Sequence, residues 1–151
     1  MVFKTDADSF LLRTSIHEGA TRKYFCFDVF ENDKLTAEFK NFSHEEMILP
    51  YTANICPLGD FCWKCSFEKG EKTVRIVFPF SVYPIISEIE LVNATYIEPV
   101  KRSKTMLMYG DSITHGYDSL NPSRAYAVQL AHMLDAEAFN KAIGGEMFCP
   151  G

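Results

Sequence analysis

Apolar side chains recur at every second position in short runs of residues 1–99. In the clearest run, Val74, Ile76 and Phe78 alternate with their neighbours, as expected for a strand that buries one face. Further strands are predicted over residues 22–30, 35–39, 47–51, 61–67, 72–80 and 85–97, with an edge strand at 10–13. Short strands at roughly ten-residue spacing indicate a β-sandwich, here of jelly-roll-like type.

Turn residues separate several of these strands. Asn32-Asp33 and residues 41–44 supply polar connections. The sequence Glu68-Lys69-Gly70-Glu71 lies between two strand candidates. A short Gly-containing connection between alternating runs is typical of a β-hairpin. We therefore predict that 61–67 and 72–80 pair as neighbours.

The pattern changes after Pro99, and residues 100–104 read as a polar linker that includes the basic run Lys101–Lys104. Residues 106–109 are apolar without alternation, which predicts a strand buried on both faces. A helix is predicted over 124–134 with Ser123 as N-cap, followed by a strand at 136–143. The expected apolar face of this helix comprises Tyr126, Leu130, Met133 and Leu134. Residues 105–151 thus predict one βαβ unit.

A possible nucleophile follows the strand at 106–109. Gly110-Asp111-Ser112-Ile113-Thr114 would lie at the strand's carboxyl end, where open α/β sheets bind their ligands. The sequence resembles the first motif of the GDSL, or SGNH, hydrolases, and the resemblance implies that Ser112 is the nucleophile. It is not a Gly-x-Ser-x-Gly elbow, because Thr114 replaces the second glycine. The alternative is an ordinary turn in which Asp111 and Ser112 bond nearby backbone.

A second motif lies at residues 140–145. Asn140-Lys141-Ala142-Ile143-Gly144-Gly145 resembles the family's Asn-x-x-Ile-x-Gly pattern. The resemblance implies that the Gly145 N–H donates to the oxyanion hole, which stabilises the tetrahedral intermediate. The alternative is a Gly-Gly turn that closes a strand.

Two further motifs of the family are missing. The chain contains neither Gly-x-Asn-Asp, which supplies another oxyanion donor, nor Asp-x-x-His, which supplies the base. His115 and His132 do not follow an aspartate by three residues. The resemblance therefore implies a truncated αβα, flavodoxin-like domain at 105–151. We expect the chain alone to be inactive, and this segment to be disordered or covered by the sandwich, a second copy or the rest of the domain.

Composition narrows the function classes. The chain of 151 residues is 47% hydrophobic, which is enough for a sizeable core. Its net charge of −5 argues against a nucleic-acid partner. No apolar run approaches the length of a membrane span, and residues 1–6 lack the apolar core of a signal peptide. The odd number of cysteines, five, favours free thiols and a cytoplasmic location.

Other candidate sites are weaker. Cys62 and Cys65 form a Cys-x-x-Cys sequence on a predicted strand, where they would point to opposite faces, so we expect neither a metal nor a redox site. His44 beside Glu45 reads as a solvated turn. Trp63, Tyr51 and Tyr83 could form a sugar-stacking platform, although core placement is favoured for Trp63.

Two function classes follow. The resemblance implies an ester hydrolase that forms an acyl-serine intermediate, without a metal or organic cofactor. Relatives with a preceding sandwich suggest carbohydrate O-acetyl esters or small esters as substrates. The alternative is a binding module in which the sandwich recognises sugar or another chain and residues 104–151 are a remnant.

Overall fold

The computed structural model describes residues 1–19, 22–49 and 53–145. The chain forms two compact units, Met1–Val100 and Lys101–Gly151, which are considered separately. The predicted strand at 47–51 is wrong over 47–49, which lie outside any strand, and its remaining residues lie outside the described ranges. Among the described residues, no helix is long and apolar enough to cross a membrane.

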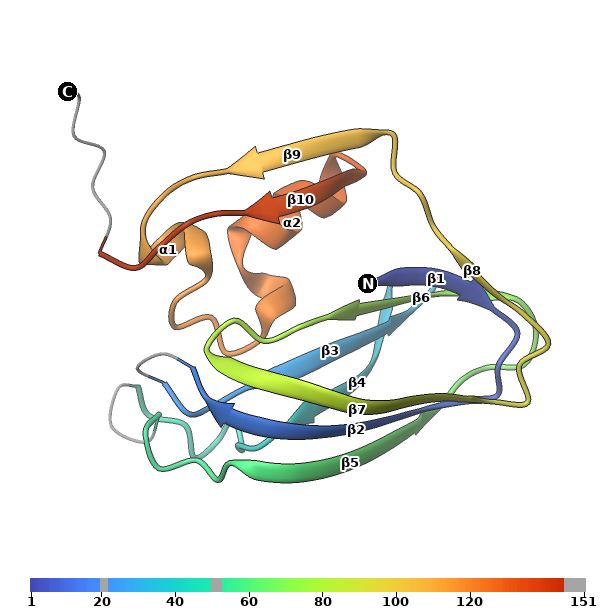
Figure 1. Ribbon diagram of the computed structural model, residues 1–151, viewed down its shortest axis with the longest axis horizontal. Coiled ribbons are helices and arrows are strands. Elements are labelled where there is room, and N and C mark those ends of the chain that lie inside the picture. The colour runs from blue at the N-terminus through green and yellow to red at the C-terminus, as the bar shows by residue number, and fades with distance from the viewer. Residues whose placement is uncertain (20–21, 50–52, 146–151) are drawn as a thin grey trace. The chain divides into compact units, whose positions relative to one another are not determined.

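The first unit consists of two antiparallel sheets (Figure 1). The five-stranded sheet has the order β4-β3-β6-β1-β8 and the three-stranded sheet the order β5-β2-β7. The strands are β1 Val2–Thr5, β2 Ser9–Glu18, β3 Cys26–Glu31, β4 Lys34–Lys40, β5 Gly59–Ser66, β6 Lys72–Val77, β7 Val82–Val92 and β8 Ile97–Pro99. The prediction of a β-rich unit is confirmed, whereas its jelly-roll character stays a prediction.

One apolar core joins the two sheets. Phe10 and Leu12 of β2 share this core with Phe27 of β3 and Val74 of β6. Each of these side chains is almost completely buried. Burial of one such side chain stabilises the fold by about 1.5–3 kcal/mol before the cost of ordering it. For β6, the alternation read from the sequence thus identifies the buried face.

The predicted hairpin between residues 61–67 and 72–80 is wrong. β5 pairs with β2, with Leu12 opposite Trp63, while β6 pairs with β1 and β3 in the other sheet. The connection after β5 therefore carries the chain from one sheet to the other. Alternation shows which face of a strand is buried, but it does not specify the neighbouring strand.

Two other strand assignments also need correction. The predicted edge strand at 10–13 is part of β2, which is the central strand of its sheet. The predicted strand at 85–97 divides into β7 and β8, which belong to different sheets. The break coincides with Asn93, whose φ of 58° bends the chain away from extended geometry.

The second unit contains a parallel strand pair. β9 (Lys104–Met108) lies beside β10 (Ala136–Asn140), with Met108 opposite Asn140. Between the strands come α1 (Ser112–His115), a 3₁₀ turn (Pro122–Arg124) and α2 (Tyr126–Met133), as Figure 1 shows. Parallel strands require such a crossover connection.

The details of α2 differ from the sequence prediction. Ser123 lies in the 3₁₀ turn, and Ala125 is the N-cap residue without a side-chain hydrogen bond. The buried residues of α2 are Ala127 and Ala131, whereas Met133 is 80% exposed. The expected face of large apolar side chains is therefore not the buried one. Two alanines at i and i+4 form a stripe that lets a helix approach its neighbour closely.

Candidate active site

Ser112 lies directly after the turn that ends β9. The preceding Asp111 is the N-cap residue of α1, and its Oδ1 accepts a hydrogen bond of 3.0 Å from the Ile113 N–H. The Asp111 carbonyl accepts another from the His115 N–H. Asp111 therefore braces the turn, and Ser112 is the first residue of the helix. We call residues 109–114 the serine turn.

Gly110 is required by close packing inside this turn. A Cβ atom at position 110 would lie 2.2 Å from Thr114 Oγ1. Thr114 is buried, and its hydroxyl is 2.6 Å from the Tyr126 hydroxyl on α2. The threonine therefore has little freedom to move aside, and any larger residue at 110 would displace α1.

The residues after β10, 141–145, form what we call the glycine loop, which is hydrogen-bonded to the serine turn. Asn140 is the principal link: its Nδ2 donates to the Thr114 carbonyl at 2.7 Å, and its Oδ1 accepts from the Ala142 N–H at 3.0 Å. The Ile143 N–H donates to the Gly110 carbonyl at 3.1 Å. Sequence reasoning identified Asn140 only as part of a motif and missed this bridging role.

Gly144 brings the glycine loop against Ser112. A Cβ atom at Gly144 would lie 3.8 Å from the Ser112 Cβ. Gly145 follows with a φ of 84°, a conformation that favours glycine. The loop that carries the predicted oxyanion donor thus lies beside the predicted nucleophile. Sequence reasoning singled out Gly145 and missed Gly144; the direction of the Gly145 N–H toward Ser112 stays a prediction.

The carboxyl ends of β9 and β10 therefore supply a hydroxyl and a glycine-rich loop at one place. Tyr117 follows α1 and is partly exposed. A serine hydroxyl needs an adjacent base to act as a strong nucleophile. The family's base motif, Asp-x-x-His, is missing from the sequence. The described residues thus bring the predicted nucleophile and the loop of the predicted oxyanion donor together, while the sequence lacks the family's base motif.

The remaining sequence candidates lie in the first unit. Cys62 is exposed and Cys65 half-buried on opposite faces of β5. Burial raises the pKa of Cys65 to about 11. Trp63 stacks on Phe61 and Phe39 at the core, so its core placement is confirmed. Tyr83 is exposed, and Tyr51 lies outside the described residues.

A group of possible metal ligands was not anticipated from the sequence. Cys26, Asp28 and Glu38 place one sulfur and two carboxylate oxygens within 4.8 Å of one another. The thiol donates to Asp28 at 3.2 Å, and Lys40 Nζ lies 3.0 Å from Glu38. Burial, followed by the Asp28 charge, raises the pKa of the Cys26 thiol. The lysine already offers a counter-charge, so we interpret the group as a polar network.

Comparisons with known proteins reveal a shared fold. No family model matches the sequence, and no characterised protein matches it by sequence. A salicylyl-acyltransferase from a tetracycline biosynthetic pathway, SsfX3, has a similar structure, with a TM-score of 0.66 and 22% identity over 93% of this chain and 39% of its own. A family two carbohydrate esterase from Clostridium thermocellum, solved with cellohexaose, has a TM-score of 0.68 and 14% identity over 95% and 44% of the two chains.

A third similar structure is the acetyl xylan esterase Est2A from Butyrivibrio proteoclasticus. It has a TM-score of 0.64 and 16% identity over 94% of this chain and 39% of its own. The present chain thus spans about two-fifths of the length of these three proteins. At these identities the likeness establishes a common fold with esterases and an acyltransferase.

Proposed function

We propose that the chain is the nucleophile-bearing part of a serine ester hydrolase of the GDSL/SGNH type. One observation carries the proposal: the serine turn after β9 and the glycine loop after β10 lie side by side, with Gly144 in contact range of Ser112. A nucleophile and oxyanion donors must flank the same carbonyl group, and the closeness of the two segments supports assigning these roles to them. The shared fold with esterases supports the same conclusion.

The reaction assigns a role to each element. Ser112 Oγ attacks the ester carbonyl while a base removes its proton, and the Gly145 N–H stabilises the oxyanion. Collapse of the tetrahedral intermediate expels the alcohol, which takes up the proton, and leaves an acyl-serine. Water then attacks the acyl-serine, releasing the acid and restoring the Ser112 hydroxyl.

We propose that carbohydrate O-acetyl esters, or small esters, are the substrates. Two of the similar structures are esterases whose names refer to carbohydrate or acetyl xylan. The proposal also uses the resemblance of the two sequence motifs to the family. The acetyl group requires little space beside Ser112, which suits a site where a glycine loop lies within contact range of the serine.

We further propose that a continuation of the αβα domain completes the site and supplies the base. Leu107 and Phe139 are opposite one another in the β9–β10 pair, and they are 53% and 46% exposed. Strands of parallel sheets are normally covered on both faces. A segment that covers these side chains could also bring the histidine to Ser112, so we expect this chain alone to be inactive.

The test is p-nitrophenyl acetate hydrolysis by the protein with a complete αβα domain. We expect Ser112→Ala to abolish turnover, and Ser119→Ala, which removes a nearby hydroxyl outside the serine turn, to retain it. A folded Ser112→Ala variant with wild-type turnover would overturn the assignment. Robust Ser112-dependent hydrolysis by the isolated 151-residue chain would show instead that the base lies within this sequence.

A further inference from the structure

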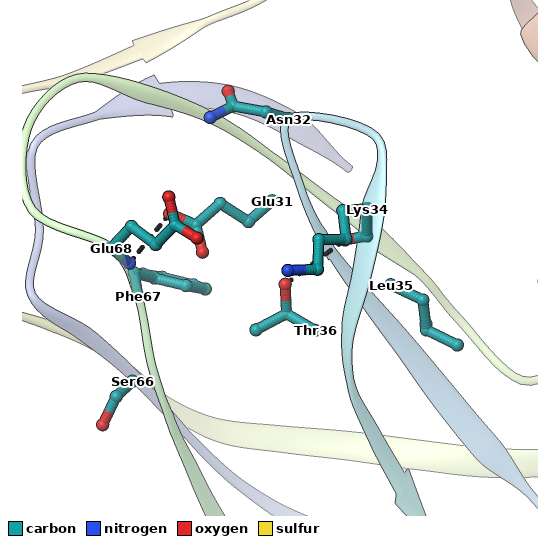
Figure 2. Close-up of a pocket in the computed structure, with 8 residues that line it drawn as sticks. All are labelled: Glu31, Asn32, Lys34, Leu35, Thr36, Ser66, Phe67 and Glu68. Atoms are coloured by element: carbon teal, nitrogen blue, oxygen red, sulfur yellow. Dashed lines mark hydrogen bonds between the residues drawn. The ribbon is translucent and has the colours of Figure 1, made fainter.

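A cleft of about 490 Å³ lies at one end of the first unit. Its walls are the β3–β4 hairpin and the end of β5 with the residues that follow, as Figure 2 shows. Small-molecule sites typically occupy clefts of about 300–1,000 Å³. All lining residues belong to the first unit. The cleft is therefore separate in sequence from the elements that carry Ser112.

The interior of the cleft contains an ionisable group that is rarely buried. Glu31 is only 7% exposed, and its Oε1 accepts a hydrogen bond of 2.9 Å from the Glu68 N–H. A carboxylate has about four acceptor positions, so Glu31 retains capacity for further donors. Figure 2 shows the Glu31 and Glu68 carboxylates extending into the same part of the cleft.

A buried positive charge lies close behind this lining. Lys72 is 4% exposed and donates to the Ala7 carbonyl at 2.7 Å. Its Nζ is 5.9 Å from the centre of the Phe67 ring, and Phe67 lines the cleft. The Phe67 ring thus provides an apolar surface in the cleft lining, with a buried ammonium group close to it.

The rim presents donors and acceptors together. Lys34, Thr36 and Ser66 lie at the rim with exposed side chains. The hairpin is held by the Asn32 side chain, which accepts from the Thr73 N–H at 2.9 Å. Thr36 Oγ1 donates to the Lys34 carbonyl at 3.2 Å. A wall fixed in this way loses little conformational freedom when it binds a ligand.

The mixture of groups selects the chemistry of the ligand. An anion would be repelled by the Glu31 and Glu68 carboxylates, and a cation would be repelled by the Lys34 ammonium group, which lines the same cleft. An apolar ligand would leave the polar lining without hydrogen-bond partners. A neutral molecule with many hydroxyl groups can donate to the carboxylates, accept from the ammonium and contact the Phe67 ring. We propose that this cleft binds a neutral saccharide.

The proposal does not depend on Ser112 chemistry. Its test is a titration of the ¹⁵N-labelled 151-residue chain with cellohexaose, xylohexaose or mannohexaose, followed by amide chemical shifts. We expect at least one oligosaccharide to shift the amides of residues 31–36 and 66–68, with the same affinity in Ser112→Ala. Shifts confined to residues 110–116 and 141–145 would place the sugar at the serine turn and overturn the cleft assignment, while leaving the proposed hydrolase intact.

Matched variants test the lining. Glu68→Gln and Lys34→Met change exposed side chains and should each weaken binding about tenfold or more, as expected for a lost hydrogen bond to a charged group. Glu90→Gln alters an exposed carboxylate on β7 and should leave the affinity unchanged. Unchanged affinity in both cleft variants, or no shift at the cleft with any of the three sugars, would overturn the proposal.

Discussion

Replacing Asn140 by alanine should loosen the glycine loop from the serine turn. The substitution removes the 2.7 Å bond to the Thr114 carbonyl and the 3.0 Å bond from the Ala142 N–H. Each such bond contributes about 0.5–1.5 kcal/mol, so the two together contribute about 1–3 kcal/mol. Because both lie within the second unit, the effect should be local.

Amide hydrogen exchange measures this loosening directly. A loss of about 1–3 kcal/mol in the opening free energy should accelerate exchange at the Ala142 and Ile143 amides about 5- to 150-fold. Lys141→Ala is the matched control, because Lys141 contributes a backbone hydrogen bond to Met108 that the substitution retains. Wild-type exchange rates at both amides in Asn140→Ala would refute the view that this side chain couples the loop to the turn.

Three further perturbations test the same account. Gly110→Ala should destabilise the second unit by about 1–3 kcal/mol, because the new Cβ overlaps the Thr114 side chain; unchanged exchange protection of the Gly116 and Tyr117 amides would contradict this. Gly144→Ala should lower kcat/KM of the complete enzyme by adding a methyl group at Ser112, and wild-type kinetics would argue against that placement. Iodoacetamide at pH 8 should modify exposed Cys62 before Cys65, because burial raises the pKa of Cys65 to about 11 and the thiolate is the reactive form. The labelling rate of Cys65 should rise as the pH approaches 11. Equal labelling rates of Cys62 and Cys65 at pH 8 would contradict the burial argument.

Local patterns predicted the parts of the fold that depend on local chemistry. Alternation identified the buried face of β6, and the Gly-Asp-Ser sequence identified the turn after β9. Asp111 braces that turn through its own neighbours. Such features arise within a few residues and can be read from the sequence.

Features that depend on distant partners were missed or assigned wrongly. The connection around Gly70 looks like a hairpin turn, but β5 and β6 find their partners in β2, β1 and β3. Large apolar residues on α2 dominate its pattern, whereas the buried residues of this helix are Ala127 and Ala131. In both cases, long-range packing overrides the local signal.

The candidate site shows the same division. Ser112 and Gly145 were identified from their motifs, which are continuous in sequence. The closeness of Gly144 to Ser112 and the two hydrogen bonds of the Asn140 side chain require two strands to lie side by side in a particular register. Glu31, Phe67 and Glu68 of the cleft converge for the same reason, because the β3–β4 hairpin and the end of β5 lie together only in the folded unit.

The most direct test of the central claim is covalent trapping of the nucleophile. The protein with a complete αβα domain is treated with a fluorophosphonate ester, which phosphonylates an activated serine, and the label is mapped by peptide mass spectrometry. The account predicts one labelled residue, Ser112, and no labelling in Ser112→Ala. An active enzyme that carries the label on another residue, or that remains active and unlabelled at Ser112, would contradict it.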